Sequence, residues 1–316
     1  TEVILFARNF CDNIEKVRSR LLNSEQDWGH YKSFIVKDPK ERVINAAPLS
    51  ERIMHHAMMN IIEPIFERQQ IFHSYACRKG KGTQAAVLHA FKQTKRFGFF
   101  LKLDVRKYFD SIDQKTLMKQ ILRLIKDQSV LHLLHGVIAS YHVEPQKGLP
   151  IGNLTSQYFA NHYLSGLDHN ILEHIKPGAY VRYMDDFILW HDEKAELKRI
   201  SSVLHDYCRD KLKLELKASV IGSSTQGLPF LGFLIKNSGI YLLNKSKRRM
   251  KKRARQISVE LQSGQIDEDK AAMKANSVNT SVLIARSRAY RTKLWKGDSQ
   301  GLEPRLTWRA GPEASS

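Results

Sequence analysis

Two adjacent aspartates, Asp185 and Asp186, lie between two short runs of strand-forming residues. The runs are Tyr180–Tyr183 and Phe187–Trp190, and a short polar turn between such runs predicts a tight β-hairpin. Adjacent carboxylates at an apolar hairpin tip repel each other and resist desolvation unless a cation neutralises them. A divalent metal ion would meet that need, and a solvated Asp-Asp turn is the alternative that the dipeptide alone leaves open.

A third aspartate, Asp104, stands near the end of the alternating apolar segment Phe99–Val105, which predicts a strand. From this strand the predicted order is strand, helix, long helix, hairpin, helix, strand, and this order fits the split βαβ, ferredoxin-like arrangement. The arrangement would place Asp104 beside the hairpin tip, so that three carboxylates converge. Three carboxylates are enough to hold two Mg²⁺ ions, which prefer oxygen ligands.

The composition indicates what such a site would act on. The chain has 316 residues with 51 Lys or Arg against 32 Asp or Glu, a formal net charge of +19, and so basic a protein usually faces nucleic acid. Residues 241–316 carry 17 basic and 7 acidic residues, and Lys245–Arg255 holds eight cations in eleven positions. Because two metal ions can activate a hydroxyl and stabilise a leaving oxygen, the sequence predicts nucleotidyl transfer on nucleic acid.

Other classes of protein fit less well. No run of 18 apolar residues exists, so we expect no membrane partner. The three cysteines, Cys11, Cys77 and Cys208, match no zinc spacing, which favours reduced thiols and a cytoplasmic protein. The basic loop Cys77–Thr83 lacks the ending of a P-loop, so it is either a phosphate-contacting loop or a solvated connection.

Hydrophobic periodicity predicts the elements that carry these residues. Residues 1–30 carry a helical pattern. The other expected helices are a helix capped by Ser50 that kinks or ends at Pro64, Gln84–Thr94, a helix capped by Asp113, and one helix through Phe159 and Ile175. The expected strands are Tyr31–Val36, Arg42–Ile44, Leu212–Lys217, and Phe230–Ile235 as one buried strand with a Gly break.

In this order the motifs resemble those of reverse transcriptases. The matching segments are Arg42–Pro48 with Glu51-Arg52, Lys102–Asp110, Tyr183–Asp186, Leu212–Lys217 and Phe230–Phe233. The resemblance implies an α+β, right-hand polymerase with a ferredoxin-like palm, fingers and a helical basic thumb. It also implies an N-terminal helical extension at 1–30, fingers and palm (the reverse transcriptase domain) at 31–240, and the thumb at 241–316.

Within that family the chain is most similar to the reverse transcriptases of diversity-generating retroelements. This similarity rests on Ile44–Pro48, His55–Ala57, Ser74–Thr83 and above all Ile151–Gln157. Most reverse transcriptases carry Gln-Gly-x-x-x-Ser-Pro at the last site, where this chain has Ile151 for the Gln and Gln157 for the Pro. The resemblance implies an RNA-directed DNA polymerase that makes error-prone cDNA in mutagenic retrohoming. The alternatives are a group II intron-like or phage-defence reverse transcriptase, and a non-catalytic RNA-binding protein.

The resemblance also implies roles for individual residues. Two Mg²⁺ ions, for which Mn²⁺ may substitute, would be held by Asp104, Asp185 and the Val105 carbonyl, with Asp186 as the accessory carboxylate. The nucleotide site would comprise Lys37, Arg42, Phe109, Ile151, Gly152, Gln157 and Lys217. Primer and template would contact Arg78, Lys79, Lys81, Tyr183, Met184, Phe230, Leu231, Gly232, Lys247, Arg248, Lys251 and Lys252.

For four of these residues the type of side chain explains the role that the resemblance implies. Arg42, with Lys37 or Lys40, would grip the incoming triphosphate, since arginine suits bidentate phosphate contacts. Phe109 would crowd a ribose 2′-hydroxyl, unless it is a plain core residue. Lys217 would donate a proton to pyrophosphate, unless it is a surface lysine. Ile151 replaces a hydrogen-bonding Gln near the nascent pair, so either base selection loosens, with errors opposite template adenine, or Ile151 is a neutral packing residue.

The implied partners are an RNA template, a DNA or RNA primer, the cDNA product and dNTPs. A small basic oligomeric accessory protein is a further partner that the diversity-generating group implies, and the source would be prokaryotic or a phage.

Overall fold

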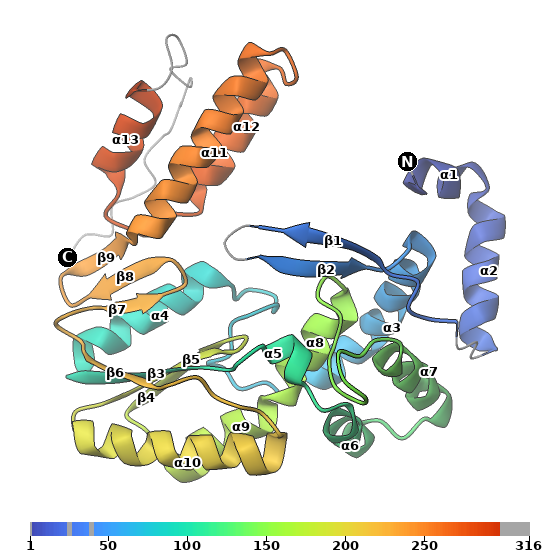
Figure 1. The fold of residues 1–316 in the computed structure, drawn as a ribbon, viewed down its shortest axis with the longest axis horizontal. Helices are drawn as coiled ribbons and strands as arrows, with labels where there is room; N and C mark the ends of the chain where they lie inside the picture. The colour runs from blue at the N-terminus through green and yellow to red at the C-terminus, as the bar shows by residue number, and fades with distance from the viewer. Residues whose placement is uncertain (1, 24–26, 38–40, 298–316) are drawn as a thin grey trace. The chain divides into compact units, whose positions relative to one another are not determined.

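The computed structural model describes residues 2–23, 27–37 and 41–297, which form two compact units (Figure 1). The first unit comprises residues 1–86 and 99–221, and the second comprises residues 87–98 and 222–316. The boundary after Ile221 falls inside the region expected to hold fingers and palm. No helix in the described ranges has the length and apolar character needed to cross a membrane.

The first unit combines helices with two antiparallel sheets. Its elements are α1 (Glu2–Arg8), α2 (Phe10–Leu22), β1 (Lys32–Val36), β2 (Arg42–Ala46), α3 (Leu49–Glu67), β3 (Phe99–Asp104), α5 (Tyr108–Ser111), α6 (Gln114–Leu124), α7 (Gln128–Ala139), α8 (Leu154–Tyr163), α9 (Ser165–Asn170), the π-helical turn η1 (Ile171–Ile175), β4 (Ala179–Tyr183), β5 (Asp186–His191) and α10 (Lys194–Leu212).

The central sheet has four strands in the order β4-β5-β3-β6. The boundary between the two units falls within its last strand, β6 (Val220–Ser223). Phe187–Trp190 of β5 are fully buried, as expected for a continuous apolar run that is covered on both faces. Helix α10 packs on β3 and β5, because Leu197, Ile200 and Leu204 form its buried stripe. The sheet is therefore a rigid support for the residues at its strand ends.

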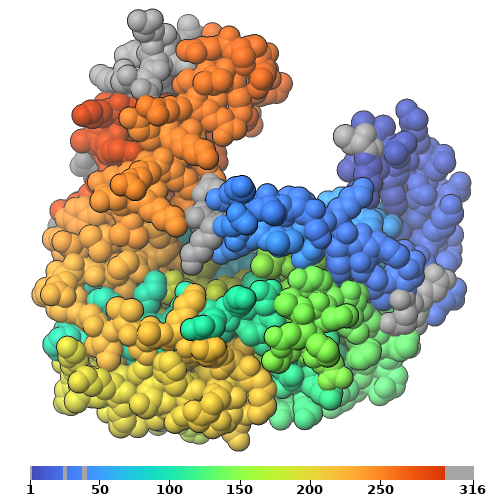
Figure 2. Space-filling model, viewed as in Figure 1, coloured from blue at the N-terminus to red at the C-terminus, as the bar shows by residue number. Residues whose placement is uncertain are grey.

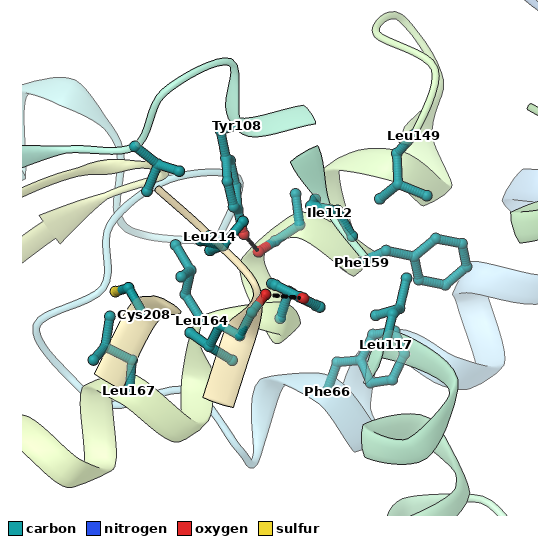
Figure 3. Packing of buried hydrophobic residues seen from close by; sticks show 14 of the residues in the cluster. Phe66, Tyr108, Ile112, Leu117, Leu149, Phe159, Leu164, Leu167, Cys208 and Leu214 are labelled. Carbon is teal, nitrogen blue, oxygen red and sulfur yellow. Dashed lines mark hydrogen bonds between the residues drawn. The ribbon is translucent and has the colours of Figure 1, made fainter. Parts of the chain in front are cut away.

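The core of the first unit is one cluster, in which buried residues of the sheet and of α10 join those of α3, α6, α8 and α9. Figure 3 shows Phe66 of α3, Leu117 of α6 and Phe159 of α8 packed together, with the rings of Phe66 and Phe159 edge to face at 6.2 Å. The buried Tyr108 hydroxyl donates to the Ala160 carbonyl at 2.5 Å, so its polar group is satisfied. This contact anchors α5, which directly follows the Asp104 strand, to α8.

The second unit holds a three-stranded antiparallel sheet and a helical bundle. The sheet has the order β7 (Leu228–Phe230), β8 (Phe233–Lys236) and β9 (Gly239–Leu242). Helix α11 (Asn244–Gln262) packs on α12 (Glu268–Thr280) and α13 (Arg288–Gly297), and Figure 2 shows the surface of these helices in orange and red. Helix α4 (Thr83–Arg96) begins in the first unit and continues in the second.

Several predicted helices have different bounds in the structure. The helical pattern expected over residues 1–30 corresponds to two separate helices, α1 and α2, and the second ends at Leu22. Helix α3 starts after Pro48 rather than Ser50 and continues through Pro64 to Glu67, because a proline in the last turn removes only one intrahelical bond. The Asp113 cap is confirmed, since its side chain accepts from the Thr116 amide.

The long helix through Phe159 and Ile175 is three elements, α8, α9 and η1. The apolar spacing persists across the breaks because α9 and the π turn keep their apolar side chains on the core. In η1 the Lys176 amide donates to the Ile171 carbonyl, a five-residue step. Helix α7 has no counterpart in the sequence-based prediction.

Two predicted strands are also wrong. In Leu212–Lys217, Leu212 ends α10 and Lys213 has φ +56°, so the segment leaves a helix and forms one isolated bridge, between Leu216 and Val105. The predicted strand Phe230–Ile235 is a hairpin, with β7 and β8 joined at Leu231 and Gly232. Both residues have positive φ, +48° and +89°, which reverses the chain where one continuous strand was expected.

Candidate functional site

The Asp-Asp hairpin is formed by β4 and β5, whose register pairs Tyr183 with Asp186. Met184 and Asp185 are therefore the two residues of the turn. Met184 has φ +55°, a conformation in which glycine is usual at the first turn position. A non-glycine residue held there costs about 1–3 kcal/mol, so surrounding contacts must hold the turn in place.

The strand carrying Asp104 lies directly against this hairpin. The register of β3 with β5 places Asp104 opposite Asp186. Beyond Asp104, the Lys217 amide donates to the Asp104 carbonyl and the Arg106 amide to the Glu215 carbonyl, each at 2.8–2.9 Å. These two hydrogen bonds form the bridge between Val105 and Leu216, and neither of them uses the Val105 carbonyl. The structure thus brings all three aspartates to one end of the sheet.

Two lysines neutralise two of the three carboxylates. The Lys217 ammonium lies 2.5 Å from Asp104 Oδ1, and the Lys102 ammonium lies 3.0 Å from Asp186 Oδ2. Asp186 Oδ1 is buried and has no hydrogen-bond partner. Asp185 forms no ion pair within the described part of the chain. The site therefore holds more buried negative charge than its lysines satisfy.

The pKa shifts have the sign expected for crowded, desolvated carboxylates. Burial raises the pKa of the Asp186 carboxyl to about 6, Lys102 opposes the rise, and the negative charges of Asp104 and Asp185 add to it. Burial likewise raises the pKa of Asp185, Asp104 adds to this effect, and Lys217 and Arg42 oppose it. A bound cation would reverse these shifts by favouring the ionised forms.

The donor set fits a hard divalent ion. Carboxylate oxygens are the ligands that Mg²⁺ prefers, and one or two of them plus substrate phosphates commonly suffice. Among the described residues, however, no three His, Cys, Asp or Glu side chains gather as a ready metal cluster. Lysines engage two of the three aspartates, Asp104 through Lys217 and Asp186 through Lys102, and the Asp186 carboxyl is mostly buried.

The predicted nucleotide residues lie on several elements of the first unit. Arg42 is exposed at the start of β2, and its charge acts on Asp185. Lys37 is exposed beyond β1, whereas Lys40 lies outside the described residues. Phe109 in α5 is half-buried against the core, and its ring meets Tyr108 edge to face at 5.8 Å.

The Ile151 loop is fixed to β2. The Asn45 amide donates to the Ile151 carbonyl at 2.8 Å, and Asn153 bonds to the backbone of Asn45 and Ala47. Gly152 has φ +119°, and a Cβ atom there would lie 2.7 Å from a methyl group of Ile44. The half-buried Gln157 accepts from the Cys77 thiol at 3.3 Å, which ties α8 to the basic loop.

The three cations of the basic loop differ in what they contact. Arg78 is turned inward, since it pairs with Glu67 at 2.6 Å and donates to the carbonyls of Ile71 and Ser74. These contacts engage its guanidinium within the protein, and its contact with template stays a prediction. The Lys81 ammonium lies over the Phe72 ring, 3.3 Å from the centroid. Lys79 is almost fully exposed.

The predicted primer and template residues are divided between the two units. In the first unit the Tyr183 hydroxyl accepts from Thr83 at 3.1 Å. In the second unit Phe230 is buried, and the Gly232 carbonyl at the hairpin turn accepts from Ser246 at 2.7 Å. Helix α11 buries Ser246, Met250, Ala254 and Ile257, which leaves Arg248, Lys251 and Lys252 exposed and Lys247 half-buried near the Tyr290 ring.

Sequence reasoning missed two cations of this site, Lys102 and Arg182. Lys102 stands two residues before Asp104, so both side chains lie on the same face of β3. This spacing was the signal in the sequence that Lys102 lies near the aspartates. Arg182 is fully buried in β4 and pairs with Asp168 at 2.6 Å. A lone arginine within an apolar strand, followed by the Asp-Asp turn, was the signal for Arg182.

Comparison with known proteins identifies the fold and the family. The sequence profile described as "Reverse transcriptase (RNA-dependent DNA polymerase)" matches residues 35–235, more than half of the chain. The chain belongs to the reverse transcriptase family. Telomerase structures from Candida tropicalis and Candida albicans resemble it with TM-scores of 0.54 and 0.51 at 12% and 14% identity, covering 69% and 85% of this chain and 49% and 55% of theirs. The predicted α+β, right-hand polymerase fold is confirmed.

Curated relatives point to intron-type members of the family. Protein YkfC of Escherichia coli is 26% identical over 276 residues, which cover 68% of this chain and 70% of that protein. The group II intron-encoded protein LtrA of Lactococcus lactis is 25% identical over 332 residues, covering 78% and 54%. A putative COX1/OXI3 intron 1 protein of Saccharomyces cerevisiae is 22% identical over 163 residues, covering 49% and 18%. The chain thus spans only part of these relatives, and the names do not support the predicted diversity-generating subgroup.

Proposed function

We propose that this chain is an RNA-directed DNA polymerase that synthesises cDNA from an RNA template. The observation that carries the proposal is the register that sets Asp104 opposite Asp186, beside a turn that presents Asp185. This arrangement lies inside the segment that matches the reverse transcriptase family. Its substrates would be dNTPs and a DNA or RNA primer paired with the template.

In this proposal Asp104 and Asp185 are the metal ligands, with the Val105 carbonyl as a backbone ligand. Two bound Mg²⁺ or Mn²⁺ ions would supply the activation of the primer hydroxyl and the stabilisation of the leaving oxygen. Asp186 would act as the accessory carboxylate, and Lys102 contacts one of its oxygens. Lys217 contacts Asp104 and is 43% exposed, so it can reach both the carboxylate and a leaving pyrophosphate.

The nucleotide would be held by residues of the fingers and palm, assigned to 31–240. Arg42 and Lys37 are exposed and free to contact the triphosphate. The aromatic face of Phe109 would exclude a ribose 2′-hydroxyl. Ile151, Gly152 and Gln157 would lie near the nascent pair.

The template–primer would lie along the cations of α11 in a thumb assigned to 241–316, which follow the phosphate backbone without reading sequence. Exposed Lys79 and half-buried Lys81 would contact the template. Tyr183, Met184 and the segment Phe230–Gly232 would support the primer end.

The biological role divides into two candidates. The names of the curated relatives favour a group II intron-like enzyme. The Ile151 and Gln157 replacements favour a diversity-generating enzyme, which would work with a small basic accessory protein and would copy RNA with frequent errors. One relative is from Escherichia coli, which is compatible with a prokaryotic source.

Primer extension on a defined RNA template tests the proposed polymerase activity. Sequencing of the cDNA then distinguishes the two biological roles. The wild-type chain should extend the primer with Mg²⁺ or Mn²⁺, and Asp185→Ala should lose at least a hundredfold in rate. Equal activity in Asp185→Ala would refute the metal assignment, and RNA binding without extension would favour a non-catalytic protein. Errors concentrated at template adenine, and reduced by Ile151→Gln, would favour the diversity-generating role. A low, uniform error rate in both proteins would favour the intron-type enzyme.

A further inference from the structure

Arg182 is a fully buried arginine on β4, one residue before Tyr183. Its guanidinium forms a two-point contact with Asp168 of α9, from Nε to Oδ1 at 2.8 Å and from Nη2 to Oδ2 at 2.6 Å. The Tyr180 hydroxyl donates to the same carboxylate at 2.7 Å. Such forked pairs fix the orientation of the guanidinium as well as its charge.

The remaining donors of Arg182 point to the catalytic turn and its surroundings. Nη1 donates to the Met184 carbonyl at 3.1 Å and to Asn161 Oδ1 at 3.0 Å, and Nη2 donates to Gln70 Oε1 at 3.2 Å. Met184 is the residue with φ +55°, and Asp185 is the next residue in the chain. The guanidinium therefore holds the peptide that immediately precedes the candidate metal ligand.

The backbone of Arg182 joins the same region to the segment before the basic loop. Its amide donates to the His73 carbonyl, and its own carbonyl accepts from the Tyr75 amide, each at 3.0 Å. Asn161 in turn donates to the Ala76 carbonyl at 2.6 Å. Contacts with α8, α9 and residues 73–76 thus hold the Arg182–Asp168 pair in place. Its position therefore does not depend on the turn.

A buried ion pair is weak support for stability, because well-packed apolar residues often replace one without loss. The contacts of Arg182 with the turn suggest another purpose. We propose that Arg182 is a positioning residue, which holds the Met184 peptide in its left-handed conformation and thereby sets Asp185 for metal binding. This inference rests on the proposed function, and Arg182 itself contacts no reacting atom.

Mn²⁺ binding to the free protein, without nucleic acid, measures this role directly. Free Mn²⁺ is followed by electron paramagnetic resonance, and the relevant site is the binding that Asp185→Asn abolishes. Arg182→Lys should weaken that site roughly tenfold, because lysine is a single-point donor and cannot contact both Asp168 and the Met184 carbonyl. Asp113→Ala, which removes the α6 cap, is the control: it should lower the melting temperature and leave Mn²⁺ affinity unchanged.

A double-mutant cycle with Met184→Gly separates turn positioning from general damage. Glycine adopts φ +55° without strain, so Arg182→Lys should weaken Mn²⁺ binding at most about threefold in the Met184→Gly background. If Arg182→Lys does not fold, Asp168→Asn loosens the same guanidinium and should show the same dependence on residue 184. Equal losses in both backgrounds, or unchanged affinity in a folded variant, would overturn the inference. Because the readout is metal binding, a chain that copies no RNA would refute the proposed function without affecting this comparison.

Discussion

Replacing Lys102 with methionine removes the cation that contacts Asp186 and keeps most of the side-chain volume. In the metal-free chain the pKa of Asp186 is about 6, against an ordinary value of 3.8, and Lys102 keeps it from rising further. A charge-assisted hydrogen bond contributes about 1.5–3 kcal/mol, and the 20% exposure of the Asp186 side chain argues for the lower end. Since one pKa unit corresponds to about 1.4 kcal/mol, Lys102→Met should raise the pKa of Asp186 by about one further unit.

The sign of the effect on stability follows from the raised pKa in the folded state. Protonated Asp186 favours the folded chain, and this contribution is lost as the pH rises through the folded pKa. At pH 5 Asp186 is protonated in both proteins, so the charge contributes no difference between them. At pH 8 it is ionised in both, and Lys102→Met should be less stable by about 1.4 kcal/mol. The difference should develop mainly between pH 6 and 7.

Urea unfolding in EDTA at pH 5 to 8, by circular dichroism, measures this difference as a function of pH. Lys102→Arg is the matched control, because it keeps the charge and should follow the wild-type curve. A loss of stability in Lys102→Met that is constant from pH 5 to 8 would show that packing, not the ion pair, is responsible. Such a result would refute the electrostatic account of Asp186.

Three further predictions concern the nucleotide, the duplex and the loop at 151–153. Phe109→Ala should lower the preference for dNTPs over rNTPs at least tenfold in kcat/KM, and an unchanged ratio would favour a plain core residue. Replacing Lys247, Arg248, Lys251 and Lys252 together with glutamine should weaken the salt dependence of duplex binding, measured by filter binding. The slope of log K against log[salt] should become shallower by up to about 0.9 for each phosphate that the helix no longer neutralises. Gly152→Ala should lower the free energy of unfolding by about 1–3 kcal/mol, because alanine is strained at φ +119° and its Cβ would meet Ile44; an unchanged melting temperature would contradict this.

The arrangement of the site was predictable because it depends on strand order and alternation. The Phe99–Val105 alternation and the apolar runs around Asp185-Asp186 suffice to place Asp104 beside the hairpin. The split βαβ order then leaves few topologies to consider. By contrast, the β7–β8 hairpin was missed because Leu231, a residue type that rarely adopts positive φ, occupies a turn position.

The contacts of Lys102 and Arg182 could not be predicted, because each depends on side chains far apart in sequence. Lys102 meets Asp186 across 84 positions, and Arg182 meets Gln70 across 112. Local patterns report which face of an element a residue occupies, not which partner lies there. These two cations became visible only when the register of β3, β4 and β5 was known.

The structure also makes Ile151 an informative position for deciding between the two biological roles. The backbone on either side is fixed, since the Ile151 carbonyl accepts from Asn45 and Asn153 bonds to two backbone groups near β2. Gly152 is held at φ +119°, close against Ile44. Replacing the Ile151 side chain should therefore leave the backbone of the loop in place. The error spectra of wild-type and Ile151→Gln proteins would then differ only through the chemistry of that side chain, which the names of relatives cannot reveal.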